Sequence, residues 1–214
     1  MFLPGVNTPQ GPAQRTICKN NTRKLGLGIL NYESDHGTLP PAFTVDAAGN
    51  RLHSWRTLIL PYIEEPALYE SIDLSKPWDD PVNAQASASM PDVFLCPSSK
   101  IPSRQTTYLA VVVPGGCFGS DTPRTLAEFT DDTSQTLMLM EVGQEQAIHW
   151  MSPNDVDEKI IASMGSQTKL AHPRAFHAMT VDGACHLVPS DTSPATLSKL
   201  ISVAGKDPVD TLNF

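Results

Sequence analysis

The chain has 214 residues, which is long enough for one well-buried hydrophobic core or at most two small ones. Its formal net charge of −8 argues against a general nucleic-acid-binding protein, which needs a basic surface, and against electrostatic docking on anionic lipid. No apolar run approaches the length of a membrane-spanning helix, and the first residues lack the charged and apolar regions of a signal peptide.

The first predicted element is a helix over residues 12–35. Pro12 suits its first turn, where a missing N–H group costs nothing, and His36-Gly37 suits its end. Four residues at helical spacing form one apolar face: Cys18, Leu25, Ile29 and Tyr32. This face indicates that the helix packs against another layer of the protein.

The central part of the chain predicts short elements between proline-rich loops. Residues 42–53 form a loop or a short hairpin, followed by a short helix that Ser54 caps and Pro61 divides. Residues 81–90 read as an alanine-rich helix. Apolar and β-branched runs predict three strands, of which the second is expected to be central in its sheet: residues 92–96, 107–113 and 136–142.

A β-hairpin is predicted near the C-terminal end, with strands at residues 175–181 and 184–188. Asp182-Gly183 is the expected two-residue turn, because this pair tolerates positive φ angles. That turn places Met179 opposite His186. Period-2 alternation then predicts a core face and a second, partly solvated face. The core face holds Phe176, Ala178, Thr180, Cys185 and Leu187, and the second holds His177, Met179, Val181, Ala184 and His186.

Ser193 and Pro194 predict the start of a last helix over residues 195–203, and residues 206–214 read as a loosely held tail. The sequence contains no internal repeat and no clear boundary between domains. These elements predict an α+β fold in a single domain that spans residues 1–214.

The chain also carries a family resemblance. His172, nine intervening residues and Asp182-Gly183 match the H-X9-DG signature of bacterial prepilin-type proteins, which resemble major pseudopilins of type II secretion. The resemblance extends to residues 18–27 and 31–41, and to residues 96–99 and 131–142. It implies a pilin-like fold, in which the N-terminal helix packs on an antiparallel sheet that ends in the hairpin and last helix.

The same resemblance implies a function. It predicts a non-catalytic structural protein, the head of a pseudopilin-like subunit on the extracytoplasmic side of the cell envelope. The N-terminal helix would contact other protein subunits of an envelope assembly. Contact with the membrane would come only through a hydrophobic half-helix that we expect to be missing before residue 1, so this chain should be monomeric. Nucleic acid is not an expected partner.

Four cysteines stand in the chain, and none forms a C-x-x-C pair, which argues against a zinc knuckle. An even count in a protein of extracytoplasmic type permits two disulfides with three pairings, or buried free thiols. The resemblance favours Cys18 with Cys96, because both lie in its best-matching segments. It assigns His172, Asp182 and Gly183 to a structural motif.

Two kinds of metal site can be considered from the residues. His177 and His186 would share a hairpin face with His172 nearby. The structural alternative is that His172 makes a hydrogen bond to a loop near Asp182. Oxygen-rich loops that suit calcium occur at residues 79–80, 131–132 and 154–158, but no EF-hand spacing assigns ligands. We therefore predict no cofactor.

Two other functions remain as alternatives. The first is a solute- or glycan-binding module in which Trp55, Trp78 and Trp150 line a cleft. The second is a hydrolase that uses Cys117 or a serine, with a histidine within hydrogen-bond reach. The chain has no G-x-S-x-G elbow and no phosphate-binding glycine loop, so we predict that it is not an enzyme.

Overall fold

A computed structural model describes residues 10–119 and 122–205, and the predicted tail at residues 206–214 lies outside this range. The helices are α1 (Gln10–His36), α2 (Trp55–Leu58), α3 (Pro66–Glu70), α4 (Ala84–Ala88), α5 (Glu158–Ser163) and α6 (Pro194–Lys199). The 3-10 turns are η1 (Leu60–Ile63), η2 (Pro81–Asn83), η3 (Asp92–Phe94), η4 (Leu126–Glu128) and η5 (Gln144–Gln146). The strands are β1 (Phe43–Val45), β2 (Arg51–Ser54), β3 (Gln105–Thr106), β4 (Tyr108–Ala110), β5 (Leu137–Glu141), β6 (Ile148–His149), β7 (Ala175–Thr180) and β8 (Cys185–Pro189). The predicted α+β class is confirmed.

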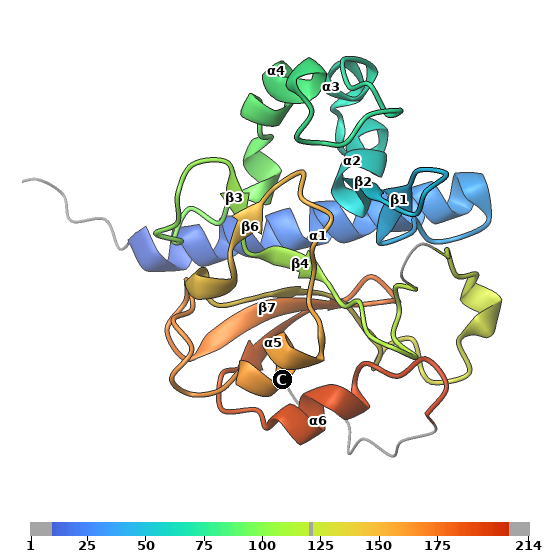
Figure 1. The fold of residues 1–214 in the computed structure, drawn as a ribbon. Helices are drawn as coiled ribbons and strands as arrows, with labels where there is room; N and C mark the ends of the chain where they lie inside the picture. The colour runs from blue at the N-terminus through green and yellow to red at the C-terminus, as the bar shows by residue number, and fades with distance from the viewer. Residues whose placement is uncertain (1–9, 120–121, 206–214) are drawn as a thin grey trace, which may run out of the picture.

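Helix α1 lies between two groups of elements (Figure 1). On one side is an antiparallel sheet in the order β4-β5-β7-β8, and α5 and α6 cover its far face. On the other side are the hairpin β1-β2 and the short helices α2, α3 and α4. The sheet is therefore buried on both faces, which explains why the predicted solvated face of β7 is wrong: α1 covers it.

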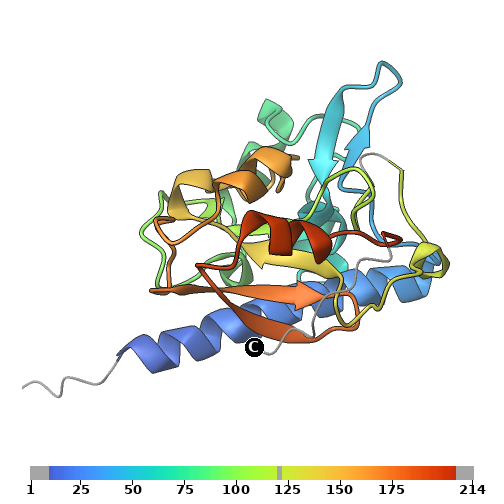
Figure 2. The same ribbon diagram turned by 90° about the horizontal axis from the view of Figure 1, so that it is seen from below.

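The sequence of α1 matches its place in the fold. Cys18, Leu25 and Ile29 are buried on one side, as the spacing predicts. Gly28 lets the helix approach η1 closely, because a Cβ atom there would lie 2.6 Å from a methyl carbon of Ile63. The first turns of α1 project beyond the sheet (Figure 2). Within the described ranges, no helix has the length and apolar character that a bilayer crossing requires.

A buried ion pair joins the two sides of the molecule. Arg56 of α2 donates to Oδ1 of Asp155 at 2.8 Å, and both side chains are buried. The guanidinium also donates to backbone carbonyls of Trp150, Ser152 and Asn154. Because these acceptors lie in the segment that follows β6, Arg56 fixes this segment against the short helices.

The hairpin β7-β8 forms where the sequence predicts it, but its register differs by one residue. Met179 pairs with Cys185, and the loop has three residues, 181–183, instead of two. Gly183 adopts a φ of +88° and its N–H donates to the carbonyl of Thr180, as in a turn followed by a left-handed residue. This shift moves every β8 side chain to the opposite face from the one predicted, so Cys185 and Leu187 share a face with His177.

Two other strand predictions need correction. Residues 92–96, predicted as a strand, contain the 3-10 turn η3 instead, and the N–H groups of Phe94 and Leu95 donate to the carbonyls of Pro91 and Asp92. The predicted central strand, residues 107–113, contains β4, which lies at one end of the four-stranded order. A parallel bridge between Val111 and Val156 continues the pairing beyond β4, so the apolar run is still buried.

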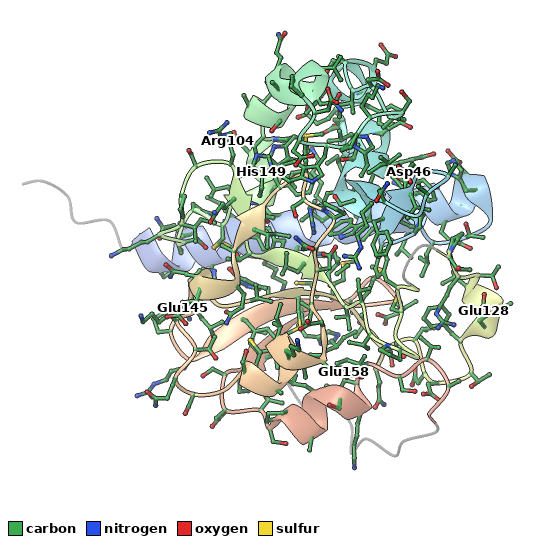
Figure 3. The ribbon with its side chains drawn as sticks, viewed as in Figure 1. Asp46, Arg104, Glu128, Glu145, His149 and Glu158 are labelled. Atoms are coloured by element: carbon green, nitrogen blue, oxygen red, sulfur yellow. A yellow bond between two sulfur atoms is a disulfide. The ribbon has the colours of Figure 1, made fainter. Side chains whose placement is uncertain are left out.

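The remaining short elements follow local sequence signals. Residues 42–53 form the hairpin β1-β2, and the carboxylate of Asp46 closes its turn by accepting from the backbone N–H groups of Ala48 and Asn50 (Figure 3). Ser193 caps α6 by accepting from the N–H of Thr196, as predicted. Helix α5 and the pairing of β3 with β6 were not predicted, because both elements are very short.

Candidate functional site

Three side chains that can bind protons or metals meet on the sheet face beneath α1. They are Glu141, the last residue of β5; His172, in the loop before β7; and His177 of β7. We call them the Glu141 cluster. The exposed fractions are 0%, 2% and 3%, and one nitrogen or oxygen atom of each lies within 4.8 Å of the others. A group of two imidazoles and one carboxylate at this separation can share a proton or hold a cation.

The sheet register brings the cluster together. Because Met140 pairs with Ala178, Glu141 lies opposite His177 in the next strand. Directly opposed residues of an antiparallel pair share a face. Met179, two residues after His177, packs against Gly26 of α1 on that same face. The cluster therefore lies between the sheet and the helix, away from bulk water.

The carboxylate of Glu141 is incompletely compensated for a buried charge. Its Oε2 atom lies 3.4 Å from Nδ1 of His177 and 3.4 Å from the backbone N of the same residue. Both distances exceed those of well-formed hydrogen bonds. Oε1 is buried and finds no hydrogen-bond partner within the described part of the chain. A buried acid with so few donors needs another positive group or a proton.

His172 connects the cluster to a disulfide. Its ring meets the ring of His177 edge to face, with centroids 5.1 Å apart. Its Nε2 atom lies 3.5 Å from Sγ of Cys96, which is joined to Cys18 of α1. Burial lowers the pKa of His172, and the nearby charge of Glu141 acts in the opposite direction. The net direction keeps this imidazole neutral near pH 7, with a lone pair available on one nitrogen.

Both disulfide cysteines are fully buried, and the bond attaches α1 to the segment that follows η3. Asn21 of α1 strengthens this attachment by donating from Nδ2 to the carbonyl of Leu95 at 3.0 Å. The other two cysteines, Cys117 and Cys185, are not joined to a partner cysteine in the described chain.

The three residues of the H-X9-DG match do not form one site. Asp182 accepts hydrogen bonds from Thr180 Oγ1 at 2.6 Å and from the backbone N of Ala184 at 3.0 Å, so it stabilises the turn. Strand β7 separates this turn from His172 by about 20 Å, given six extended residues. The expected contact between His172 and a loop near Asp182 is therefore wrong.

The structure also separates His177 from His186, which the sequence analysis considered as ligands of one ion. The one-residue register shift puts the two side chains on opposite faces of the hairpin. His186 lies opposite Ala178, and its Nε2 atom is 3.2 Å from Oγ1 of Thr180. The residue that lies beside His177 on the same face is Glu141, which belongs to strand β5.

In each of the three oxygen-rich loops, at least one acid makes a structural hydrogen bond or ion pair. Asp80 accepts from the N–H of Val82 at the start of η2, and Asp132 accepts from the N–H of Ser134. Asp155 pairs with Arg56, and Asp157 caps α5 by accepting from the N–H of Ile160. These bonds explain the clustering of acids at loop and helix starts.

Two of the three tryptophans are buried inside the protein, and the third is half-buried. Trp55 and Trp150 are fully buried and donate to Asp155 Oδ1 and to the carbonyl of Ser87, both at 3.0 Å. Trp78 is half-buried against His149, which Figure 3 labels. Trp55 and Trp150 therefore line no open cleft.

Cys117 is buried, and burial raises the pKa of its thiol, which opposes the thiolate that a nucleophile requires.

Glu141 is the site residue that the sequence reading missed. A usable signal was present, because Glu141 is the one charged residue in the apolar run from Leu137 to Val142. A charge within a strand that is buried at every position needs a partner nearby, and Nδ1 of His177 lies 3.4 Å from its Oε2 atom.

Comparisons with known proteins place part of the chain near one described family. A family model described as a protein of unknown function (DUF1559) matches residues 12–112, from the first turns of α1 to the end of the run that contains β4. No curated protein and no solved structure matches the chain. The matched stretch contains both disulfide cysteines and ends before the Glu141 cluster. Over residues 12–112, the chain is thus similar to a family whose function is unknown.

Proposed function

We propose that this chain is the globular head of a pseudopilin-like subunit, which acts in an envelope assembly on the extracytoplasmic side through contacts of α1. The support is the combination of the H-X9-DG resemblance with a long helix laid on an antiparallel sheet. In this proposal the protein contributes a surface to an assembly and does not catalyse a reaction.

The observation that carries the proposal is the projecting start of α1. Most of the residues from Gly11 to Ile17 are exposed, and this part of the helix extends beyond the sheet (Figure 2). Ile17 has 47% of its surface exposed, and Leu27, farther along the helix, has 53%. Apolar side chains on a projecting helix favour packing against a helix of a neighbouring subunit.

The disulfide and the buried face of α1 support the same role. Cys18 is attached to Cys96, and Leu25 and Ile29 are fully buried, so the helix is fixed to the body from Cys18 onward. If the projecting end of α1 binds a neighbouring subunit, the fixed part of the helix holds the globular head in a defined orientation to that subunit. This arrangement suits a structural subunit.

The test compares two charge substitutions in the full-length protein in its native cells. Ile17→Asp removes the apolar contact on α1, while Val82→Asp changes a residue of η2 that is 57% exposed. We expect Ile17→Asp to reduce the recovery of the tagged protein with prepilin-type subunits in envelope fractions by tenfold or more, where tenfold is about 1.4 kcal/mol of interaction energy. Val82→Asp should leave recovery unchanged. Equal recovery for both variants would contradict the proposal.

A further inference from the structure

We infer that the Glu141 cluster is a binding site for one Zn²⁺ ion, held by Glu141, His172 and His177. This inference is independent of the proposed assembly, because the site lies beneath α1 and not on its exposed surface. The first argument is the buried charge. Oε1 of Glu141 has no hydrogen-bond partner within the described residues, and Oε2 has only the two long contacts with His177.

The chemistry of the three donors selects the kind of ion. Two imidazoles and one carboxylate form a ligand set that Zn²⁺ uses in proteins, whereas Ca²⁺ and Mg²⁺ prefer oxygen ligands alone. The sulfur atoms of Cys18 and Cys96 lie close to His172, but a disulfide does not offer the thiolate that a metal binds. The ligand set is therefore limited to the cluster.

The geometry is close to that of a tetrahedral site. With metal–ligand bonds of about 2.0–2.1 Å, two ligand atoms of a tetrahedron lie about 3.4 Å apart. Oε2 of Glu141 and Nδ1 of His177 are 3.4 Å apart. One ligand atom of each of the three residues lies within 4.8 Å of the others, so His172 must move slightly closer to the other two to reach tetrahedral spacing. An ion among these atoms would also neutralise the buried carboxylate.

The cluster borders a surface pocket at His177. A pocket of about 200 Å³ lies against this residue, between the start of α1 and strand β8, and is lined also by Arg15, Lys19 and Leu187. Water from this pocket can supply a fourth ligand. The two cationic side chains oppose the entry of another cation into the finished fold. We therefore expect the ion to bind as the chain folds.

The competing explanation is a simple ion pair between Glu141 and a protonated His177. Both explanations place the carboxylate against the imidazole, but only the metal site needs His172 as well. The two explanations also differ in whether the refolded protein contains a bound metal ion. An ion pair forms equally well in metal-free buffer, whereas a zinc site retains an ion through gel filtration.

The experiment refolds the full chain from denaturant, with its disulfide intact, in the presence of Zn²⁺ alone, and then measures bound zinc after gel filtration. We expect one ion per chain for the wild type and a loss of most bound zinc in Glu141→Gln, His172→Gln and His177→Gln. The matched control is His186→Gln, a histidine of the same hairpin on its opposite face, which should retain zinc fully. Retention in His186→Gln together with loss in the three cluster variants supports the site.

Refolding with Co²⁺ gives a readout that needs no variant. Tetrahedral Co²⁺ absorbs visible light far more strongly than octahedral Co²⁺, so we expect an intense spectrum from the wild type. Circular dichroism checks that each variant has folded. The inference is overturned if the wild type retains no zinc, if its Co²⁺ spectrum is weak, or if folded cluster variants retain as much zinc as the wild type.

Discussion

Nε2 of His172 lies 3.5 Å from Sγ of Cys96, so the histidine and the disulfide are in contact in the buried region beside α1. The disulfide joins residues that are 78 positions apart, which restricts the unfolded chain strongly. We expect the double variant Cys18→Ser/Cys96→Ser to lose about 2–5 kcal/mol of unfolding free energy. Its Tm should fall by roughly 5–15 °C.

Thermal unfolding followed by circular dichroism checks this prediction. Cys185→Ser is the matched control, because Cys185 is half-buried and free of a disulfide. Its Tm should change little. A fall in Tm of the same size in the control and in the double variant would show that the bond contributes nothing specific.

Gly28→Ala is expected to destabilise the protein by about 1–3 kcal/mol, although alanine normally favours a helix. The added Cβ would lie 2.6 Å from Cγ2 of Ile63, a buried side chain whose branch point is held close to its backbone. Gly11→Ala is the control, because nothing lies within 4 Å of its added carbon. In urea unfolding, the free energy of unfolding should fall for Gly28→Ala and should stay the same or rise for Gly11→Ala. A gain in stability for Gly28→Ala would contradict the close packing of α1 on η1.

Asp155→Asn should cost about 3–5 kcal/mol, because it leaves the buried guanidinium of Arg56 without a charged partner. The exposed pair of Lys169 and Glu145 provides the comparison. Glu145, labelled in Figure 3, is solvated, so Glu145→Gln should change stability by less than about 0.5 kcal/mol. Denaturant unfolding of both variants measures the difference. Similar small losses in both would mean that Arg56 is accommodated by its carbonyl acceptors alone.

The stability of the fold should decrease on acidification because of His53. Burial lowers the pKa of this histidine, and hydrogen bonds with the carbonyls of Lys76 and Asp73 only partly oppose the effect. The unfolded chain therefore binds more protons than the folded chain below about pH 6.5, so the unfolding free energy falls as pH drops through that value.

Urea unfolding at about pH 7.5 and about pH 5.5 tests this prediction. The wild type should lose more stability between the two values than His53→Gln, which has no imidazole to protonate. The contribution of His53 is refuted if the two proteins lose the same amount.

Local sequence patterns were sufficient for much of the fold. The spacing of Cys18, Leu25 and Ile29 predicted the buried face of α1, and Ser193-Pro194 predicted the start of α6. Asp182-Gly183 predicted a turn, but the length of its loop depends on whether Val181 joins the strand or the turn. The two-residue and three-residue loops place opposite sides of β8 toward α1, and a local pattern does not distinguish between them when both faces of the sheet are covered.

The candidate site could not be assembled from local patterns. Glu141, His172 and His177 come from three segments, and only the pairing of β5 with β7 places them together. The hairpin pattern offered only His186 as a neighbour of His177, on a predicted shared face. The register error then removed that partner, and the true neighbour lay 36 residues earlier in the chain.

The most direct test of the proposed function is photo-crosslinking from α1 in native cells. A photoreactive amino acid replaces Ile17 in the full-length protein, and the same substitution at Val82 serves as the control. The account predicts that Ile17 forms adducts with prepilin-type subunits of an envelope assembly, identified by mass spectrometry, and that Val82 does not. Adducts confined to cytoplasmic proteins, or identical adducts at both positions, would contradict it.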